Sequence, residues 1–249
     1  KYENSFKYLI NQGVFLIIGI VLMYVFSKIN YKFYEKKANI ILLVCFLLLV
    51  LVLIPGIGVV RNGSKSWFGI GGFGIQPSEI SKIGLVIFIA KFLSRNNKDK
   101  RETIKFVIPP LLIILIFFAL IMLEPDFGTG MVIVVSLTCL IFITGTNVGI
   151  FLKLGLVGLL GIVGLIIAAP YRLERIVSFL NPWSDPLGSG FQIIQSLYAI
   201  GPGGLLGFGF LNSRQKHFYL PEPQTDFIFS IISEEFGFLG ILIISFLFL

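Results

Sequence analysis

Long apolar runs alternate with shorter polar segments along almost all of this sequence. Two of the runs, residues 40–54 and 107–123, come close to the length that a helix needs to cross a hydrocarbon core about 30 Å thick. The pattern predicts membrane-spanning helices at residues 8–26, 39–54, 80–93, 106–123, 131–144, 148–169 and 227–249. We therefore expect an all-α integral membrane protein, a polytopic helical bundle with seven spans in a single domain over residues 1–249.

The polar segments differ in charge, and this difference predicts the orientation. The first contains Lys28, Lys32, Lys36 and Lys37, and the third contains Lys91, Arg95, Lys98, Lys100, Arg101 and Lys105. Because short cytoplasmic segments are enriched in lysine and arginine, both segments are expected in the cytoplasm. Residues 55–79, 124–130 and 170–226 are then expected on the external face.

Residues 170–226 form a long extracytoplasmic loop in this prediction. A connection of this length is usually either functional or disordered. Its aromatic residues favour an ordered loop, because disordered segments contain few of them. We expect one short helix within it, at residues 192–200, lying at the membrane interface.

The composition supports a membrane protein and excludes other classes. Of the 249 residues, 56% are hydrophobic and 13% are charged, which is far too apolar for a soluble domain of this length. The net charge of +7 lies in short connections, where membrane orientation explains it, so nucleic acid is not expected as a partner. Cys45 and Cys139 lie within apolar runs and are expected to pack there, without a disulfide or a zinc site.

The two ends of the sequence predict a fragment of a longer protein. The sequence does not begin with Met, and it ends within an apolar run. In the predicted orientation the first span runs from outside to inside, so we expect at least one more span upstream.

The middles of the predicted spans carry few polar groups. Gly155, Gly158, Gly161 and Gly164 form a ladder of small residues, which we expect to let a neighbouring helix approach closely.

A first group of candidate functional residues lies near the end of the segment 55–79. Trp67 suits an aromatic belt, and Glu79 complements the N-terminal dipole of a helix that begins near Pro77. Lys82 has no such explanation. Glu79 and Lys82 stand at i and i+3 on one helix face, where they form either a structural ion pair or part of a functional site.

A second group lies in the turn between the spans at 106–123 and 131–144. Glu124 and Asp126 are two carboxylates at this turn. They are candidates for binding a cation or a substrate hydroxyl, although solvated turn carboxylates are the commoner case.

A third group lies in the long external loop. Gln192 and Gln195 occur on its predicted short helix and are expected to bind the substrate, and a glycine-rich run follows at 201–209. Arg214 and Lys216 are external cations, which run against the charge bias of membrane proteins and suit a phosphate-bearing lipid.

Three carboxylates complete the third group. Asp226 stands where the loop meets the last span, so both helix capping and a functional role stay open. Glu222 is a nearby acidic alternative. Glu234 lies inside the apolar run beside Glu235, and two carboxylates there indicate a polar cavity, which makes Glu234 another candidate for cation binding.

These motifs resemble the SEDS family of bacterial cell-wall polymerases, which contains FtsW, RodA and SpoVE. The resemblance rests on Asn62-Gly-Ser-Lys-Ser-Trp67, Gln76-Pro-Ser-Glu79, Pro125-Asp-Phe-Gly-Thr129, Asn181-Pro-Trp183, Gln192-Ile-Ile-Gln-Ser-Leu197 and Pro223-Gln-Thr-Asp226. The runs Gly201-Pro-Gly-Gly204 and Ser213-Arg-Gln-Lys216 are more similar to FtsW and SpoVE than to RodA. The resemblance implies a fold of ten spans, of which this sequence would carry the second to the eighth.

The resemblance also implies an activity. The protein would be an inverting peptidoglycan glycosyltransferase that polymerises lipid II into glycan strands at the outer face of the bacterial cytoplasmic membrane. Its partner would be a class B penicillin-binding protein, a transpeptidase, and its role would lie in division, sporulation or elongation. Asp226 matches the essential loop aspartate of the family, and Trp67, Glu79 and Lys82 match other positions on which activity depends.

The chemistry of this reaction assigns expected roles to the candidates. A base must accept the proton of the attacking sugar hydroxyl, and positive charge must stabilise the departing pyrophosphate. We expect Asp226 to be the base and Lys82, Arg214 or Lys216 to supply the charge. A divalent cation such as Mg²⁺ or Mn²⁺, held by carboxylates, is an additional source of charge, and no organic cofactor is expected. Glu79 and Lys82 are expected to line the same cavity as Asp226.

Two other functions remain as alternatives. A transporter that flips lipid II needs ionisable groups or broken helices near the middle of the bilayer, whereas the candidates here collect at the external face. A scaffold that only holds a synthase partner would leave Asp226 and Lys82 without a purpose.

Overall fold

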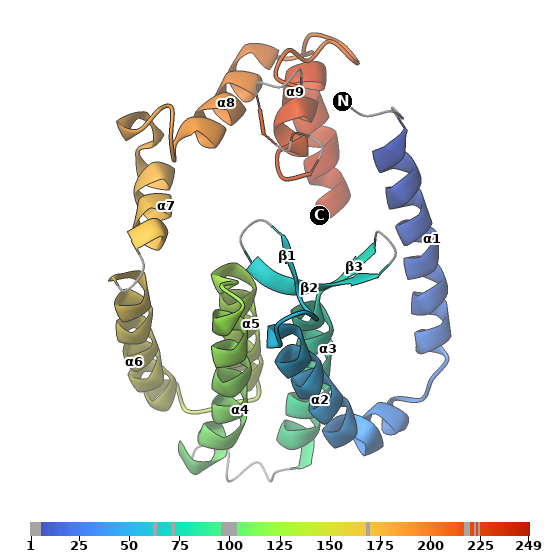
Figure 1. The fold of residues 1–249 in the computed structure, drawn as a ribbon, viewed down its shortest axis with the longest axis vertical. Coiled ribbons are helices and arrows are strands. Elements are labelled where there is room, and N and C mark those ends of the chain that lie inside the picture. The colour runs from blue at the N-terminus through green and yellow to red at the C-terminus, as the bar shows by residue number, and fades with distance from the viewer. Residues whose placement is uncertain are drawn as a thin grey trace. The chain divides into compact units, whose positions relative to one another are not determined.

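The structure is mostly helical, as predicted (Figure 1). The computed structural model describes residues 6–61, 64–70, 73–95, 104–167, 170–216, 220–221, 223 and 225–249. The helices are α1 (Lys7–Ser27), α2 (Tyr31–Leu53), α3 (Pro77–Arg95), α4 (Ile104–Leu123), α5 (Phe127–Ile143), α6 (Val148–Ile167), α7 (Pro170–Leu180), α8 (Phe191–Ile200) and α9 (Ile228–Phe248), with short 3₁₀ turns η2 (Pro182–Ser184) and η3 (Gly201–Gly203).

Five helices, α1, α2, α4, α6 and α9, are long and apolar enough to cross a membrane. Each corresponds to a predicted span. The helix α5 is apolar but has only 17 residues, and α3 is not among the five because charged residues lie near both of its ends. The count of seven spans therefore stays a prediction for α3 and α5.

Two helices begin earlier than predicted, because polar residues cap them. Asn30 accepts a hydrogen bond from the backbone N–H of Lys32 at 3.0 Å, so α2 begins at Tyr31. Asp126 accepts one from the N–H of Thr129 at 3.1 Å, so α5 begins at Phe127. The expected loop at residues 28–37 is therefore mostly the first turns of α2, and the expected external turn 124–130 is shorter.

The segment 55–79 contains a small antiparallel sheet that the all-α prediction missed. Its strands are β1 (Val59–Arg61), β2 (Ser64–Ile70) and β3 (Phe73–Ile75), in the order β1-β2-β3. Trp67 on β2 pairs with Val59 on β1. The side chain of Lys65 returns to α2 and donates to the carbonyl of Ile54 at 2.9 Å, which stabilises the C-terminal end of that helix.

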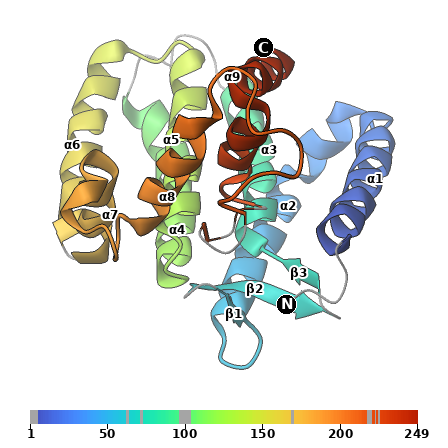
Figure 2. The same ribbon diagram turned by 90° about the horizontal axis from the view of Figure 1, so that it is seen from above.

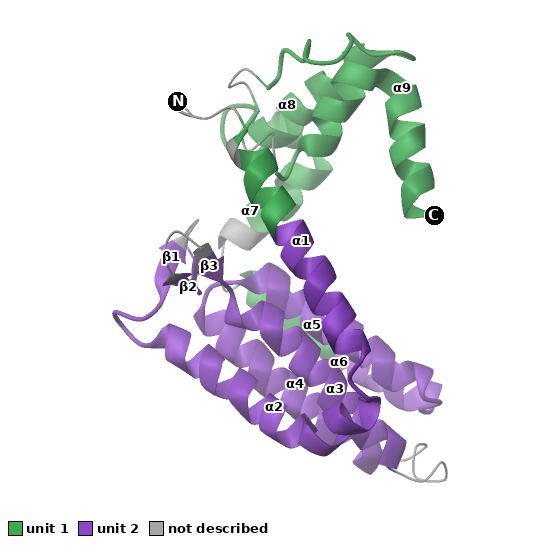
Figure 3. Ribbon diagram, turned by 90° about the vertical axis from the view of Figure 1, so that its right-hand side faces the viewer, with its two compact units in different colours: residues 1–14, 158–249 green, residues 15–157 purple. Residues whose placement is uncertain are grey.

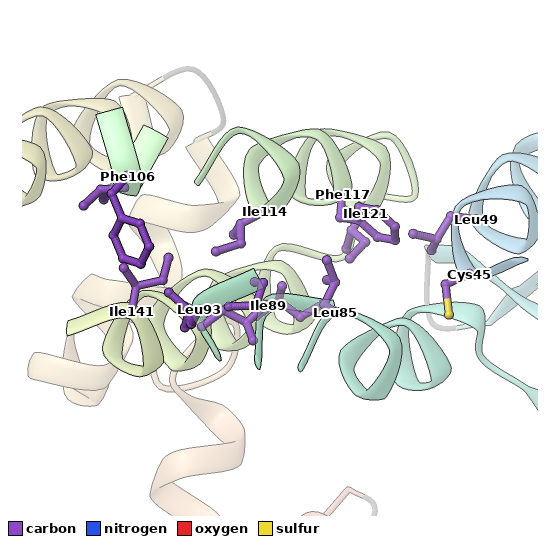
Figure 4. Packing of buried hydrophobic residues seen from close by; sticks show 13 residues of the cluster. Cys45, Leu49, Leu85, Ile89, Leu93, Phe106, Ile114, Phe117, Ile121 and Ile141 are labelled. Carbon is purple, nitrogen blue, oxygen red and sulfur yellow. The ribbon is translucent and has the colours of Figure 1, made fainter. Parts of the chain in front are cut away.

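The contacts divide the chain into two compact units, residues 15–157 and residues 1–14 with 158–249, coloured in Figure 3. The expectation of one domain stays a prediction. In the unit of residues 15–157, which is purple in Figure 3, α2, α3, α4 and α5 enclose an apolar core (Figure 4), which includes Leu49, Leu85, Ile89, Ile114, Ile121 and Ile141.

The expectations for the two cysteines and the glycine ladder are confirmed only in part. Cys45 is buried against α3, where a Cβ atom at Gly84 would lie 2.5 Å from its sulfur. Cys139 is exposed, so its expected packing role is wrong for this structure. Apart from the backbone of α6 itself, no described residue lies within 4 Å of a Cβ built at a ladder glycine, and the expected close approach of a neighbouring helix stays a prediction.

In the unit 158–249, the long external loop is largely structured. The expected helix at 192–200 is confirmed as α8, whereas α7 was not predicted. The helix α8 packs on α9, and the hydroxyls of Ser196 and Ser230 lie 2.8 Å apart between them. Figure 2 shows the chain that follows α8 running beside α9.

The helix α9 is broken near its middle, at Gly237, where φ is +61°. The segment 203–209 fills this break. The N–H groups of Phe208 and Gly209 donate to the carbonyls of Glu234 and Glu235, at 2.9 Å each, and the carbonyls of residues 204 and 205 accept from the N–H groups of residues 238 and 239. The sequence predicted an uninterrupted span at residues 227–249, so this break was not predicted.

Candidate functional site

The predicted pairing of Glu79 and Lys82 is present on α3. The Lys82 ammonium lies 2.7 Å from a carboxylate oxygen of Glu79, one turn apart on the helix. Both side chains are partly exposed, at 33% for Lys82 and 53% for Glu79, so the pair is accessible from one side of the helix. Trp67 is half-buried on the adjacent strand β2. The geometry confirms the ion pair, and the role of these residues in activity stays a prediction.

The turn between α4 and α5 is hydrogen-bonded to β2 and to the residue that precedes α3. The hydroxyl of Ser64 on β2 donates to the backbone carbonyl of Glu124. The side-chain amide of Gln76, which precedes α3, donates to the Asp126 carboxylate at 2.8 Å. Because the other oxygen of Asp126 caps α5, this carboxylate has a structural task at both oxygens.

Glu124 is fully buried in this turn, outside the spans. Neither of its carboxylate oxygens has a hydrogen-bond partner among the described residues. Burial, and to a smaller extent the negative charge of Asp126, raises the pKa of the Glu124 carboxyl to about 8. The expected solvated turn carboxylate is therefore a buried acid that is largely protonated at neutral pH.

The two glutamines of α8 differ in exposure. Gln192 is exposed and Gln195 is half-buried, and they stand at i and i+3 on the helix. Their predicted contact with substrate is compatible with this placement and stays a prediction.

The loop that carries Arg214 and Lys216 is bound to two buried carboxylates of α9. The ammonium of Lys216 lies 2.7 Å from a carboxylate oxygen of Glu235, which is 7% exposed. Glu234 is 2% exposed and accepts hydrogen bonds from the loop backbone. The polar cavity that sequence predicts around Glu234 is therefore filled by the loop itself.

The three candidate cations differ in how far their charge is compensated. Lys82 is paired with Glu79 and Lys216 with Glu235. Arg214 is exposed and, among the described residues, forms no ion pair. Arg214 is thus the candidate whose charge is most available to an anionic ligand.

Asp226 is exposed and stands two residues before the first residue of α9. Glu222 lies outside the described residues. Asp226 and Lys82 belong to different compact units, so their predicted proximity stays a prediction.

The expected divalent cation stays a prediction, because Mg²⁺ can be bound by one or two carboxylates together with substrate phosphates. Among the described residues, no group of three or more His, Cys, Asp or Glu side chains is placed to hold a metal ion.

Sequence reasoning missed the partners of the buried carboxylates. Ser213, which donates to the Glu234 carboxylate, and Glu235, which pairs with Lys216, were not among the candidate site residues. A signal was present, because two glutamates inside an apolar run require polar partners, and the nearest cations in the sequence are those of residues 213–216.

Comparisons with known proteins agree with these observations. The family of cell cycle proteins that contains FtsW, RodA and SpoVE matches residues 1–249. Stage V sporulation protein E of Bacillus subtilis is 52% identical over 248 residues, which cover 100% of this chain and 68% of that protein. A probable peptidoglycan glycosyltransferase FtsW of Saccharophagus degradans is 41% identical over 240 residues, which cover 96% of this chain and 62% of that protein.

A solved structure has a similar fold. It is a peptidoglycan synthase complex, described for its coordination of polymerization and crosslinking, and one of its chains matches with a TM-score of 0.72 at 31% identity. The match covers 96% of this chain and 66% of that chain. The present chain thus spans about two thirds of the length of the proteins that it matches.

Proposed function

Because this chain belongs to the family of FtsW, RodA and SpoVE cell cycle proteins, we propose that the intact protein is a peptidoglycan glycosyltransferase of the bacterial cytoplasmic membrane. Its substrate would be lipid II, which it polymerises into glycan strands. The observation that carries this proposal is the identity of 41% to a relative named as such an enzyme, over 96% of the chain. The similarity to FtsW and to a sporulation protein leaves both division and sporulation as roles.

The proposed reaction is a single inverting displacement. The hydroxyl oxygen of the acceptor sugar attacks the anomeric carbon of the donor, and the bond from that carbon to the pyrophosphate breaks. The pyrophosphate leaves with the electron pair, and a base accepts the hydroxyl proton. Because an α-linked donor gives a β-linked product, no covalent enzyme intermediate is needed.

Asp226 is the proposed base. It stands exposed where the external loop meets a membrane-spanning helix, so it can reach a head group anchored at the interface. Arg214 is the proposed source of positive charge for the pyrophosphate, because Lys82 and Lys216 already neutralise carboxylates. Both residues belong to the same compact unit.

A transpeptidase is the proposed partner. The structurally similar chain is part of a peptidoglycan synthase complex that couples polymerization to crosslinking. We infer the same arrangement here, with a class B penicillin-binding protein as the crosslinking enzyme.

A transporter of lipid II is the main alternative, because α9 is broken near its middle, as helices of transporters often are. In transporters, the backbone groups freed by such a break bind the substrate or an ion. Here four of these groups bond with the segment 203–209 and are not available to a ligand. The break therefore gives less support to transport than to a structural role for this segment.

An assay in detergent separates the alternatives, because flipping has no meaning without a bilayer. Purified intact protein with its partner and labelled lipid II is expected to give long glycan strands. A folded complex that makes no glycan would favour a transporter or a scaffold.

The first prediction concerns the base. Asp226→Asn keeps the side-chain shape but cannot accept the proton, so we expect glycan synthesis to fall by ~10²–10⁴-fold. The measurement is the rate of strand synthesis by the variant with its partner, normalised to folded complex. The N-cap of α9 is Phe227, without a side-chain capping hydrogen bond, so the capping role left open by the sequence is not present, and near-normal synthesis would rule out Asp226 as the base.

A further inference from the structure

The carboxylate of Glu234 is enclosed by the loop that carries Arg214. The backbone N–H of Arg214 donates to one of its oxygens at 2.8 Å, and that of Gln215 donates to the other at 3.3 Å. The hydroxyl of Ser213 donates to the second oxygen as well, and it also accepts a hydrogen bond from the backbone N–H of Lys216 at 3.2 Å. One buried carboxylate thus binds the backbone of two consecutive loop residues directly and that of Lys216 through the Ser213 hydroxyl.

The side chain of Arg214 also contacts an aromatic ring. Its guanidinium lies 5.3 Å from the ring centroid of Phe208, within the range of a cation–π interaction. The backbone N–H of Phe208 donates to the carbonyl of Glu234 at 2.9 Å. Both members of the cation–π pair are therefore attached to Glu234, one through its side chain and the other through its main chain.

Glu234 is too deeply buried to act on a substrate itself. It is 2% exposed, and the nearby ammonium of Lys216 pairs with Glu235 instead. Among the described residues, the hydrogen bonds of its carboxylate all go to the loop, so an effect of Glu234 on the reaction has to pass through the loop.

We propose that Glu234 is a positioning residue that holds the Arg214 guanidinium where it binds the pyrophosphate of the lipid-linked donor. This inference rests on the role proposed above for Arg214. A cation stabilises a developing charge most when it is already in place before the reaction. By fixing the loop backbone, Glu234 would restrict the positions that the exposed Arg214 side chain can take. A carboxylate is suited to this task because both of its oxygens accept hydrogen bonds.

A double-mutant cycle tests the proposal in the intact protein with its partner, with glycan synthesis per folded complex as the readout. Glu234→Gln replaces one acceptor oxygen by a donor, so the loop loses hydrogen bonds, and we expect synthesis to fall about tenfold. Arg214→Ala removes the guanidinium and is expected to slow synthesis by ~10²-fold. If Glu234 acts through Arg214, adding Glu234→Gln to Arg214→Ala will slow synthesis by no more than about twofold.

Ser230→Ala is the matched control. It removes a buried hydroxyl of the same helix, bonded to Ser196 at 2.8 Å, and does not touch the loop. Its effect is expected to be the same in both backgrounds. If Glu234→Gln gives no folded complex, Ser213→Ala replaces it, because this change removes one donor to the carboxylate and keeps the charge of Glu234. It is expected to slow synthesis about threefold when the Arg214 side chain is present and to have no effect in the Arg214→Ala background.

The outcomes separate the two proposals. If Arg214→Ala synthesises glycan slowly and the double variant shows the product of the two single losses, Glu234 does not act through Arg214. The positioning role is then wrong and the role of Arg214 stands. If Arg214→Ala synthesises glycan at the normal rate, the charge assignment fails and the positioning role fails with it, while the polymerase activity stands.

Discussion

Glu124 shows how one buried carboxyl makes the stability of a protein depend on pH. It is fully buried in the turn between α4 and α5, without a hydrogen-bond partner for its side chain among the described residues. Its folded-state pKa of about 8 lies above the ordinary value of 4.5, so the folded state favours the protonated form. This turn thus contains a group that favours the fold only while it is neutral.

This raised pKa predicts the direction of a pH dependence. The stabilising contribution is fully present below pH 4.5, falls as the pH rises towards 8 and is lost above it. The limiting slope is about 1.4 kcal/mol per pH unit. Thermal unfolding in detergent from pH 5 to pH 9 is therefore expected to show a falling Tm for the wild type. Glu124→Gln stays neutral and is expected to remove this part of the fall; parallel curves for the two proteins would contradict the prediction.

The sequence predicts contacts between residues that are close along the chain, but not contacts between distant residues. The spacing of Glu79 and Lys82 predicts their contact, because i and i+3 meet on any helix. Arg214 and Glu234 are twenty positions apart, and their contact depends on how the loop folds back on α9. The periodicity of apolar residues does not indicate how a loop folds back onto a helix.

At the scale of the elements, the break in α9 depends on glycines at two distant places. A Cβ atom at Gly207 would lie 2.3 Å from the backbone of Glu235, and one at Gly237 would lie 2.4 Å from the backbone of Gly207. Both glycines also have positive φ, +73° and +61°. A single glycine in an apolar run is compatible with a continuous helix, so hydropathy predicted the span correctly and missed its break.

Alanine substitutions test this interpretation. Gly207→Ala forces a side chain against the α9 backbone at a positive φ, and we expect a loss of about 3 kcal/mol of stability. Gly161→Ala on α6 is the control, because a Cβ atom there meets nothing within 4 Å, and it is expected to change stability by less than about 0.5 kcal/mol. Thermal unfolding in detergent measures both effects. Equal unfolding midpoints for the two variants would show that stability does not depend on the close approach of the segment 203–209 to the α9 backbone.

At the scale of the whole molecule, the structure brings two basic helix ends together. Lys91 on α3 donates to Asn39 on α2 at 2.9 Å, and Arg95 pairs with Glu35 at 3.3 Å. The start of α2 and the end of α3 therefore lie at one level, as expected for two segments on the same side of a membrane. Charge predicts that this side is the cytoplasm.

Accessible cysteines test the orientation in a background without Cys45 and Cys139. Leu187 and Val60 are 90% and 62% exposed and are predicted to be external, and Tyr31 is 70% exposed and predicted to be cytoplasmic. In whole spheroplasts, an impermeant thiol reagent is expected to label cysteines at Leu187 and Val60 and to leave one at Tyr31 unlabelled until the cells are opened. The opposite pattern would reverse the predicted topology.

The filled break in α9 also has a consequence for biogenesis. A helix with two glutamates and an interrupted hydrogen-bond ladder is a poor substrate for insertion into a bilayer by itself, because unpaired polar groups are costly there. The segment that satisfies these groups, residues 203–216, precedes α9 in the chain and leaves the ribosome first. During synthesis, the segment is therefore available before the helix whose polar groups it pairs. In a circular permutation that reversed this order, α9 would have to insert while these polar groups are still unpaired, and we expect its insertion to be less efficient.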